Sequence, residues 1–187
     1  MASSEAAPAA AAPEKSVAVV GLDDSEHSYY ALQWTLDHFF ANAHFCPPLF
    51  SLVIVHAKPS PTSVVGLAGP GAADVLPFVE TDLRKIAGRV VEKAKELCVS
   101  RSGLKMEDVR KLSGNEGTVT NVLVEVVEGD ARNVLCEAVE KHQATMLVLG
   151  SHGYGAIKRA VLGSVSDYCA HHAHSTVMIV KKPKVKH

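Results

Sequence analysis

The chain has 187 residues, of which 47% are hydrophobic, and its formal net charge at pH 7 is -1. That length predicts one domain with a substantial core and leaves too little chain for two comfortable domains. The small net charge excludes a global attraction to nucleic acid or to an anionic membrane, so recognition has to be local. No apolar run approaches the ~18 residues that a membrane-spanning helix needs.

Residues 1–14 are rich in Ala and Pro and contain neither Lys nor Arg, so they lack the features of a secretory signal or a mitochondrial transit peptide. We expect them to form a disordered leader. The cysteines lie tens of residues apart without a C-x-x-C pair, which argues against a disulfide framework and against a zinc knuckle. Isolated thiols are typical of a reducing compartment, and we predict a cytoplasmic protein. The cysteines are Cys46, Cys98, Cys136 and Cys169.

Short β-branched runs alternate with helical patterns along the chain. Residues 16–21 predict a buried strand, and residues 23–26 supply capping chemistry for a helix over 26–43. A second strand is expected over 49–56, and a long amphipathic helix follows Pro77. The remaining expected elements are a strand at 119–127, a helix capped by Asp130 that runs to about 142, a strand at 145–149, a helix at 164–173 and a strand at 175–180.

Five strands that are apolar on both faces, separated by helices of crossover length, predict a parallel sheet covered on both sides. Right-handed crossovers favour a doubly wound α/β sandwich. Residues 58–76 and 100–118 are polar or Gly-rich and long for connections, so we interpret them as insertions in a domain that spans 15–182. A basic tail follows at 183–187.

In such sheets ligands bind at the carboxyl ends of the strands, where the strand order reverses. The segment GSHGYGAIKRAVLGSVS, residues 150–166, follows the fourth expected strand and contains glycines at 150, 153, 155 and 163. Glycines let backbone N–H groups approach an anion closely, and a helix start at 163–166 favours negative charge. Lys158 and Arg159 add positive charge nearby. The loop therefore predicts a phosphate site, and the alternative is an ordinary connection from strand to helix.

Common catalytic motifs are missing or incomplete. There is no G-x-x-x-x-G-K-[ST], which excludes a Walker-type NTPase, and the first turn at 21–25 lacks the G-x-G-x-x-G of dinucleotide binding. The segment LGSHG at 149–153 departs from the G-x-S-x-G nucleophile elbow at its first position. Three histidines share the last helix region with one carboxylate, Asp167, at ligand spacing, which favours a polar face over a metal site. They are His171, His172 and His174.

The glycine spacing carries a resemblance. Gly150, Gly153 and Gly163 with Ser164 fit the pattern G-x2-G-x9-G-[ST], and the chain is similar in this respect to the universal stress protein family. Supporting blocks are VGLDDSE at 20–26, ALQW at 31–34, EGD at 128–130 and the closing strand at 177–180. The resemblance spans about residues 15–181 and is closest to the plant members of the ATP-binding branch.

The resemblance implies a five-stranded sheet of order 3-2-1-4-5 in a three-layer sandwich like that of the adenine nucleotide alpha hydrolases. It also implies a stress-response regulatory protein that binds ATP or AMP, with or without Mg2+. Asp23 would reach the ribose, Val55 would lie beside the adenine, and the glycine loop would wrap the phosphates. The expected nucleotide-binding residues are Gly21, Asp23, Val55, Gly150, Ser151, His152, Gly153, Arg159, Gly163, Ser164, Val165 and Ser166.

The resemblance further implies a homodimer that pairs through the last strand, Thr176–Val180, and a signalling protein partner. The lysines at 181–186 resemble a basic localisation signal, which adds the nucleus as an alternative location, or are simply solvated. A slow ATP hydrolase or phosphotransfer enzyme is the alternative function. We disfavour it because no Walker lysine, no carboxylate pair and no general base converge on the loop. A scaffold with an empty cleft is a third interpretation.

Overall fold

The structure is a computed structural model that describes residues 16–40, 50–65, 72–102, 109–111, 122–153 and 162–183. The expected leader at 1–14 lies outside the described residues, as does most of the basic tail. The elements in chain order are β1 (Ser16–Gly21), α1 (Glu26–Phe39), β2 (Phe50–Lys58), α2 (Pro61–Val65), α3 (Ala72–Ser102), β3 (Val109–Lys111), β4 (Val122–Glu128), α4 (Ala131–Lys141), β5 (Met146–Gly150), α5 (Ser164–His172) and β6 (Thr176–Val180).

The described strands form one parallel sheet with the order β3-β4-β2-β1-β5-β6. For the five predicted strands this is the order 3-2-1-4-5, so the doubly wound sandwich is confirmed. The sheet has one strand more than predicted, β3, which pairs with β4 at the edge and lies within the insertion expected at 100–118. Its sequence, Val-Arg-Lys, is three residues long and contains no apolar run, so periodicity gives no sign of it.

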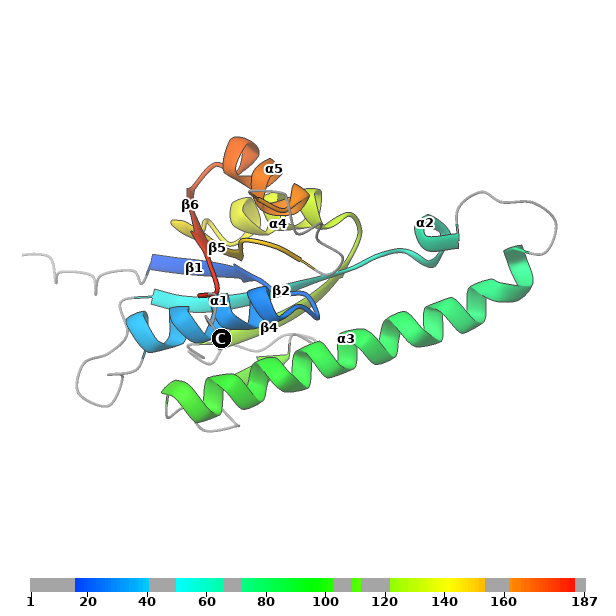
Figure 1. The fold of residues 1–187 in the computed structure, drawn as a ribbon, viewed down its shortest axis with the longest axis horizontal. Helices are drawn as coiled ribbons and strands as arrows, with labels where there is room; N and C mark the ends of the chain where they lie inside the picture. The colour runs from blue at the N-terminus through cyan, green and yellow to red at the C-terminus, as the bar shows by residue number, and fades with distance from the viewer. Residues whose placement is uncertain are drawn as a thin grey trace, which may run out of the picture.

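Helices cover both faces of the sheet, with α1 and α3 on one side and α4 and α5 on the other (Figure 1). Side chains alternate between the two sides, as the two-residue period of a strand requires. Val20 and Ile54 belong to the hydrophobic cluster under α1 and α3, whereas Val19 and Val53 belong to the cluster under α4 and α5. Every central strand therefore buries both of its faces, which is why its sequence reads as a continuous apolar run.

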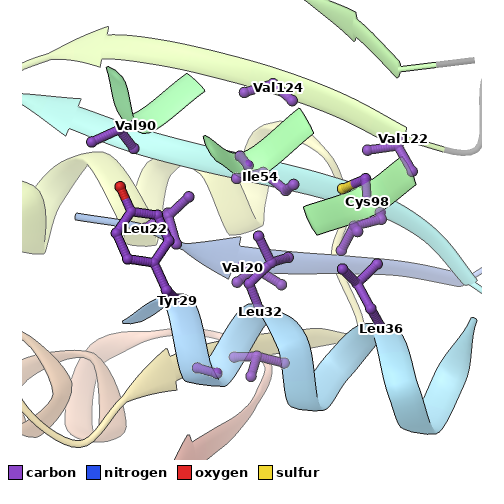
Figure 2. Packing of buried hydrophobic residues seen from close by; sticks show 14 of the residues in the cluster. Val20, Leu22, Tyr29, Leu32, Leu36, Ile54, Val90, Cys98, Val122 and Val124 are labelled. Carbon is purple, nitrogen blue, oxygen red and sulfur yellow. The ribbon is translucent and has the colours of Figure 1, made fainter. Parts of the chain in front are cut away.

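The first cluster holds α1 and the second half of α3 against the sheet. Leu32 and Leu36 of α1 are fully buried beside Val90 and Cys98 of α3 (Figure 2). Burying a leucine side chain contributes roughly 1.5–3 kcal/mol, so this packing fixes the direction of α1. The first turn of α1 is thereby placed at the carboxyl end of β1.

The first half of α3 extends beyond the sheet, next to α2 (Figure 1). The helix begins at Ala72, earlier than the expected start after Pro77, and Pro77 lies inside it. A proline removes one backbone hydrogen bond from a helix, and here it does so near the helix start, where the neighbouring Phe78 is 73% exposed. The fully buried residues of α3 begin only at Ala87.

Helix α4 is fixed at both of its ends. Asp130 caps the start, as predicted, because its side chain accepts a hydrogen bond of 2.9 Å from the backbone N–H of Arg132. Near the other end, Lys141 and His142 lie 3.0 Å and 3.1 Å from the carboxylate of Glu125, a buried residue of β4. Burial raises the pKa of Glu125. The hydrogen bonds from Lys141 and His142 lower this pKa by more than burial raises it, so the net shift is downward.

Candidate functional site

A cavity of about 240 Å³ opens at the carboxyl ends of β1, β2 and β5. The strand order reverses between β1 and β5, because the chain leaves β1 towards β2 and leaves β5 towards β6. This is the position at which doubly wound sheets bind ligands. The expected binding residues that line the cavity are Gly21, Asp23, Val55, Gly150, His152, Gly153, Gly163, Ser164, Val165 and Ser166.

Two expected residues are not among the lining residues. Arg159 lies outside the described residues, as does Lys158. Ser151 is 2% exposed and supports the site through its backbone hydrogen bonds. Its backbone N–H donates to the carbonyl of Val180, and its own carbonyl accepts from the N–H of Gly163 at 2.8 Å. Ser151 therefore links the end of β5 to the start of α5.

The turn after β1 holds Asp23 in a network of local hydrogen bonds. Its Oδ1 accepts from the backbone N–H and from the hydroxyl of Ser25. Its N–H donates to Ser28 Oγ at 3.2 Å, and that hydroxyl donates to the carbonyl of Asp23 at 2.8 Å. The N-cap of α1 is Ser25, whose side chain accepts from the N–H of Ser28. Asp23 thus shapes the turn without capping the helix.

Asp23 and the segment after β5 meet at one place in the cavity wall. A Cβ built on Gly153 would lie 2.7 Å from Oδ2 of Asp23, which is closer than real Cβ contacts come. The strand order that the family resemblance implies would set Asp23 opposite Gly150, but the glycine beside the Asp23 carboxylate is Gly153. A side chain at 153 would displace the carboxylate.

Gly150 has a different role in the wall. A Cβ on Gly150 would lie 2.7–2.8 Å from backbone atoms of His27 and Ser28 in the first turn of α1. The end of β5 can approach α1 this closely only because residue 150 lacks a side chain. Gly150 therefore sets the distance between the β1–α1 turn and the segment after β5.

The start of α5 forms another part of the cavity wall. Gly163 is the N-cap and offers no side chain to the first helical N–H groups, which have no partner inside the helix. The hydroxyl of Ser166 donates to the carbonyl of Gly163 at 2.9 Å and so stabilises the turn. A helix start of this kind presents N–H groups and partial positive charge to an anion.

His152 lines the cavity beside a second imidazole. The rings of His152 and His27 have centroids 5.2 Å apart. The hydroxyl of Ser151 lies between them, 3.1 Å from Nδ1 of His152 and 3.5 Å from Nδ1 of His27. From the sequence alone, His152 could either donate a hydrogen bond to a phosphate or simply fill the turn. The structure places it in the wall, held by Ser151.

Sequence reasoning missed part of the wall. Ala57 and Leu149 point to the same side as Val55, and the strand period could have identified them once Val55 was chosen. Ser28 has no such signal, because its place depends on how α1 packs. The missed lining residues are Leu22, Ser28, Ala57, Ala131, Leu135 and Leu149.

The charge of the wall is asymmetric. Of the lining residues, all of which lie in the described part of the chain, Asp23 is the one carboxylate, and none is a lysine or an arginine.

Across the described ranges, no group of three or more His, Cys, Asp or Glu side chains is arranged to hold a metal ion. His171 and His172 instead donate from Nδ1 to backbone carbonyls four residues earlier in α5.

Comparison with known proteins assigns the family. The profile of the Universal stress protein family matches residues 17–181. Universal stress protein PHOS34 of Arabidopsis thaliana is 32% identical over 171 residues, covering 88% of this chain and 61% of that protein. PHOS32 of the same plant is 30% identical over 168 residues, with coverages of 88% and 64%. The chain belongs to the universal stress protein family, resembles plant members, and spans less than two thirds of the length of these two relatives.

Solved structures share the fold. Universal stress protein UspA from Lactobacillus plantarum superposes with a TM-score of 0.63 at 16% identity, covering 88% of this chain and 97% of that one. A family protein from Arabidopsis thaliana with AMP bound gives 0.53 at 19% identity, with coverages of 90% and 92%. A universal stress protein in complex with cAMP gives 0.54 at 19% identity, with coverages of 90% and 98%.

Within the described ranges, no helix has the length and apolarity that crossing a membrane demands.

Proposed function

We propose that this chain is a regulatory stress protein that binds an adenine nucleotide, ATP or AMP, in the cavity between β1 and β5. The observation that carries the proposal is the combination of one carboxylate, Asp23, with glycine-lined backbone and a helix start in a single cavity. The solved structures with AMP and with cAMP support the choice of an adenine nucleotide.

Each part of the wall suits one part of a nucleotide. The apolar side chains of Val55, Ala57 and Leu135 offer a surface for a base. Asp23 accepts hydrogen bonds from ribose hydroxyls and repels phosphate, so it belongs at the sugar. The N–H groups at the start of α5 favour phosphate oxygens. The volume is slightly below the range of about 300–1,000 Å³ for typical ligand pockets, which favours one nucleotide over a dinucleotide.

Regulation is favoured over turnover by the chemistry of the wall. Hydrolysis or transfer of a phosphate needs a positioned base and positive charge or metal at the reacting phosphate. The lining residues of the described chain supply one carboxylate, which our interpretation places at the ribose, and one imidazole, His152, but no lysine or arginine to hold a reacting phosphate. The bound nucleotide would then act by changing the surface that a signalling partner reads, and Mg2+ would enter with the phosphates rather than through a protein cage.

The test is to identify what the protein carries. Small molecules released from the purified protein on denaturation are analysed by mass spectrometry, and the emptied protein is titrated with AMP, ADP, ATP and GMP by calorimetry. We expect saturable binding of adenine nucleotides, weaker binding of GMP, and no sustained ATP turnover. Repeating the titrations with Mg2+ and with EDTA separates direct phosphate binding from metal-assisted binding. If no adenine nucleotide binds even at millimolar concentration, the proposal is wrong.

We also propose a homodimer that pairs through β6, in line with the family resemblance. Thr176 donates its N–H towards β5, and Val180 accepts there, so residues 176, 178 and 180 use their backbone groups on that side. The backbone groups of Val177 and Ile179 therefore point to the open edge of the sheet. An apolar edge strand of this kind is a template for pairing with a second chain.

Val177→Pro is the matched test of this edge. It removes an N–H that points away from β5, so the fold is expected to survive while the dimer dissociates. Met178→Pro removes an N–H directed at β5 and is expected to destabilise the sheet itself. Sedimentation velocity at micromolar concentration should show a dimer for the native chain and a folded monomer for Val177→Pro. A native monomer, or a dimer unaffected by Val177→Pro, would exclude pairing through β6.

A further inference from the structure

The fold brings together two thiols that are far apart in the sequence. Cys136 lies in α4 and Cys169 in α5, and these helices pack against each other on one face of the sheet. Cys169 belongs to the hydrophobic cluster of that face, and Cys136 packs against the same cluster. The two thiols lie within interaction distance of one another. The sequence spacing, which argued against disulfides, gave no sign of this contact.

The two thiols differ in their access to solvent. Cys136 is half-buried, whereas Cys169 is completely buried, and both are free thiols. The third described thiol, Cys98, belongs to the cluster on the opposite face of the sheet and cannot compete for either of them. A reagent from solution therefore meets Cys136 first, and Cys169 lies behind it as the group that can displace the reagent.

Burial controls the reactivity of the pair. It raises the pKa of Cys136, and the hydrogen bond from Cys169 offsets part of that rise. Burial raises the pKa of Cys169 to about 12. The thiolate is the reactive form, so Cys136 is the better nucleophile and Cys169 reacts slowly. The pair should thus respond to a sustained oxidising change rather than to a brief one.

We propose that Cys136 and Cys169 are a redox modification site at which small disulfides convert the two thiols into an intramolecular disulfide. In the first step the Cys136 thiolate attacks a sulfur of the small disulfide, forms a mixed disulfide and releases one small thiolate. In the second step deprotonated Cys169 attacks the Cys136 sulfur, forms the Cys136–Cys169 bond and releases the other small thiolate. The two protons lost by the protein end on the two small thiols.

The bond would connect the two helices whose first residues form part of the cavity wall. Ala131 and Leu135 of α4 line the cavity, as do residues 164–166 of α5. Cross-linking α4 to α5 restricts the unfolded chain and stabilises the folded one, which corresponds to an upward shift of the melting temperature by roughly 5–10 °C. Reduction by a small thiol reverses the change.

The experiment uses the full chain with Cys46→Ser and Cys98→Ser, so that only the pair can react. Oxidised glutathione is added at alkaline pH, and intact mass, peptide maps and melting temperature are followed. We expect a transient glutathione adduct, then a mass two hydrogens below that of the reduced chain, a peptide that joins residues 136 and 169, and a higher melting temperature. The unsubstituted chain should yield the same joined peptide, which guards against a substitution that disturbs folding.

Two matched variants assign the roles. Cys169→Ser should keep the glutathione adduct on Cys136, because no second thiol is present to displace it. Cys136→Ser should take up glutathione at least tenfold more slowly, because Cys169 is buried. The proposal is overturned if the adduct persists in the chain that has both thiols, or if prolonged oxidation gives no peptide that joins residues 136 and 169.

Discussion

Gly150→Ala is expected to lower the free energy of unfolding by about 2–3 kcal/mol and to abolish measurable nucleotide binding. The new Cβ would lie 2.7 Å from the carbonyl carbon of His27 and 2.8 Å from the N of Ser28. These are backbone atoms in the first turn of a helix, so they cannot rotate away as a side chain would. The end of β5 and α1 must separate, and both contribute to the cavity. Urea unfolding and calorimetric titration with AMP measure the two effects.

Gly88→Ala is the control for this substitution. Gly88 lies in α3, and a Cβ built on it meets no atom within 4 Å. Alanine there is expected to leave binding unchanged and to raise stability by up to about 1 kcal/mol, because glycine is a poor helix former. Equal behaviour of the two variants would show that the approach of β5 to α1 is not tight.

Asp23→Asn is expected to weaken adenine nucleotide binding by about 10- to 100-fold with little loss of stability, since a hydrogen bond to a charged group contributes about 1.5–3 kcal/mol. Asparagine retains a carbonyl oxygen that can accept from the N–H of Ser25, so the turn after β1 is preserved. What disappears is the negative charge and the second acceptor beside Gly153. Nucleotide affinity and melting temperature, measured together, separate the loss of a ligand contact from misfolding.

Asp24→Asn provides the matched control, because it removes the same charge from the next residue. Asp24 is not a lining residue, and it accepts hydrogen bonds from the Tyr29 hydroxyl at 3.1 Å and from Arg89 at 3.2 Å. Its ion pair with Arg89 is partly exposed and contributes little. We expect an affinity within about twofold of the native value. Comparable losses in both variants would mean that the effect comes from net charge and not from Asp23 as a ligand.

Much of the fold follows from local sequence patterns. Strands such as Ser16–Gly21 are buried on both faces, so their apolar runs are conspicuous, and Asp130 caps α4 through a short-range hydrogen bond that any N-cap aspartate can make. The glycine spacing identified the segment after β5, and the parallel topology located it at the reversal of strand order. The strands and the cap of α4 are confirmed because each depends on residues close together in the chain, whereas phosphate binding by the segment after β5 stays a prediction.

The features that the sequence did not predict depend mostly on contacts between residues that are distant in the chain. The approach of Gly150 to His27 and the contact of Cys136 with Cys169 exist only after α1, α4 and α5 have packed. No periodicity or spacing encodes them. The early start of α3 has a local explanation, because a proline such as Pro77 normally marks a helix boundary. The first turns of α3 are exposed, and the helix continues through Pro77 there.

Because the first half of α3 extends beyond the sheet, the stability of this helix differs along its length. Its second half cannot open without exposing Val90, Ala94 and Cys98, so it opens only when the domain unfolds. Its first half buries little apolar surface, and its Glu80 forms an ion pair with Lys58 of β2. That half is therefore expected to unwind at a lower free-energy cost than the second half, without removing any residue that lines the cavity between β1 and β5. A single continuous helix thus joins a half that is anchored in the core beside the cavity to a half whose order we expect to vary independently.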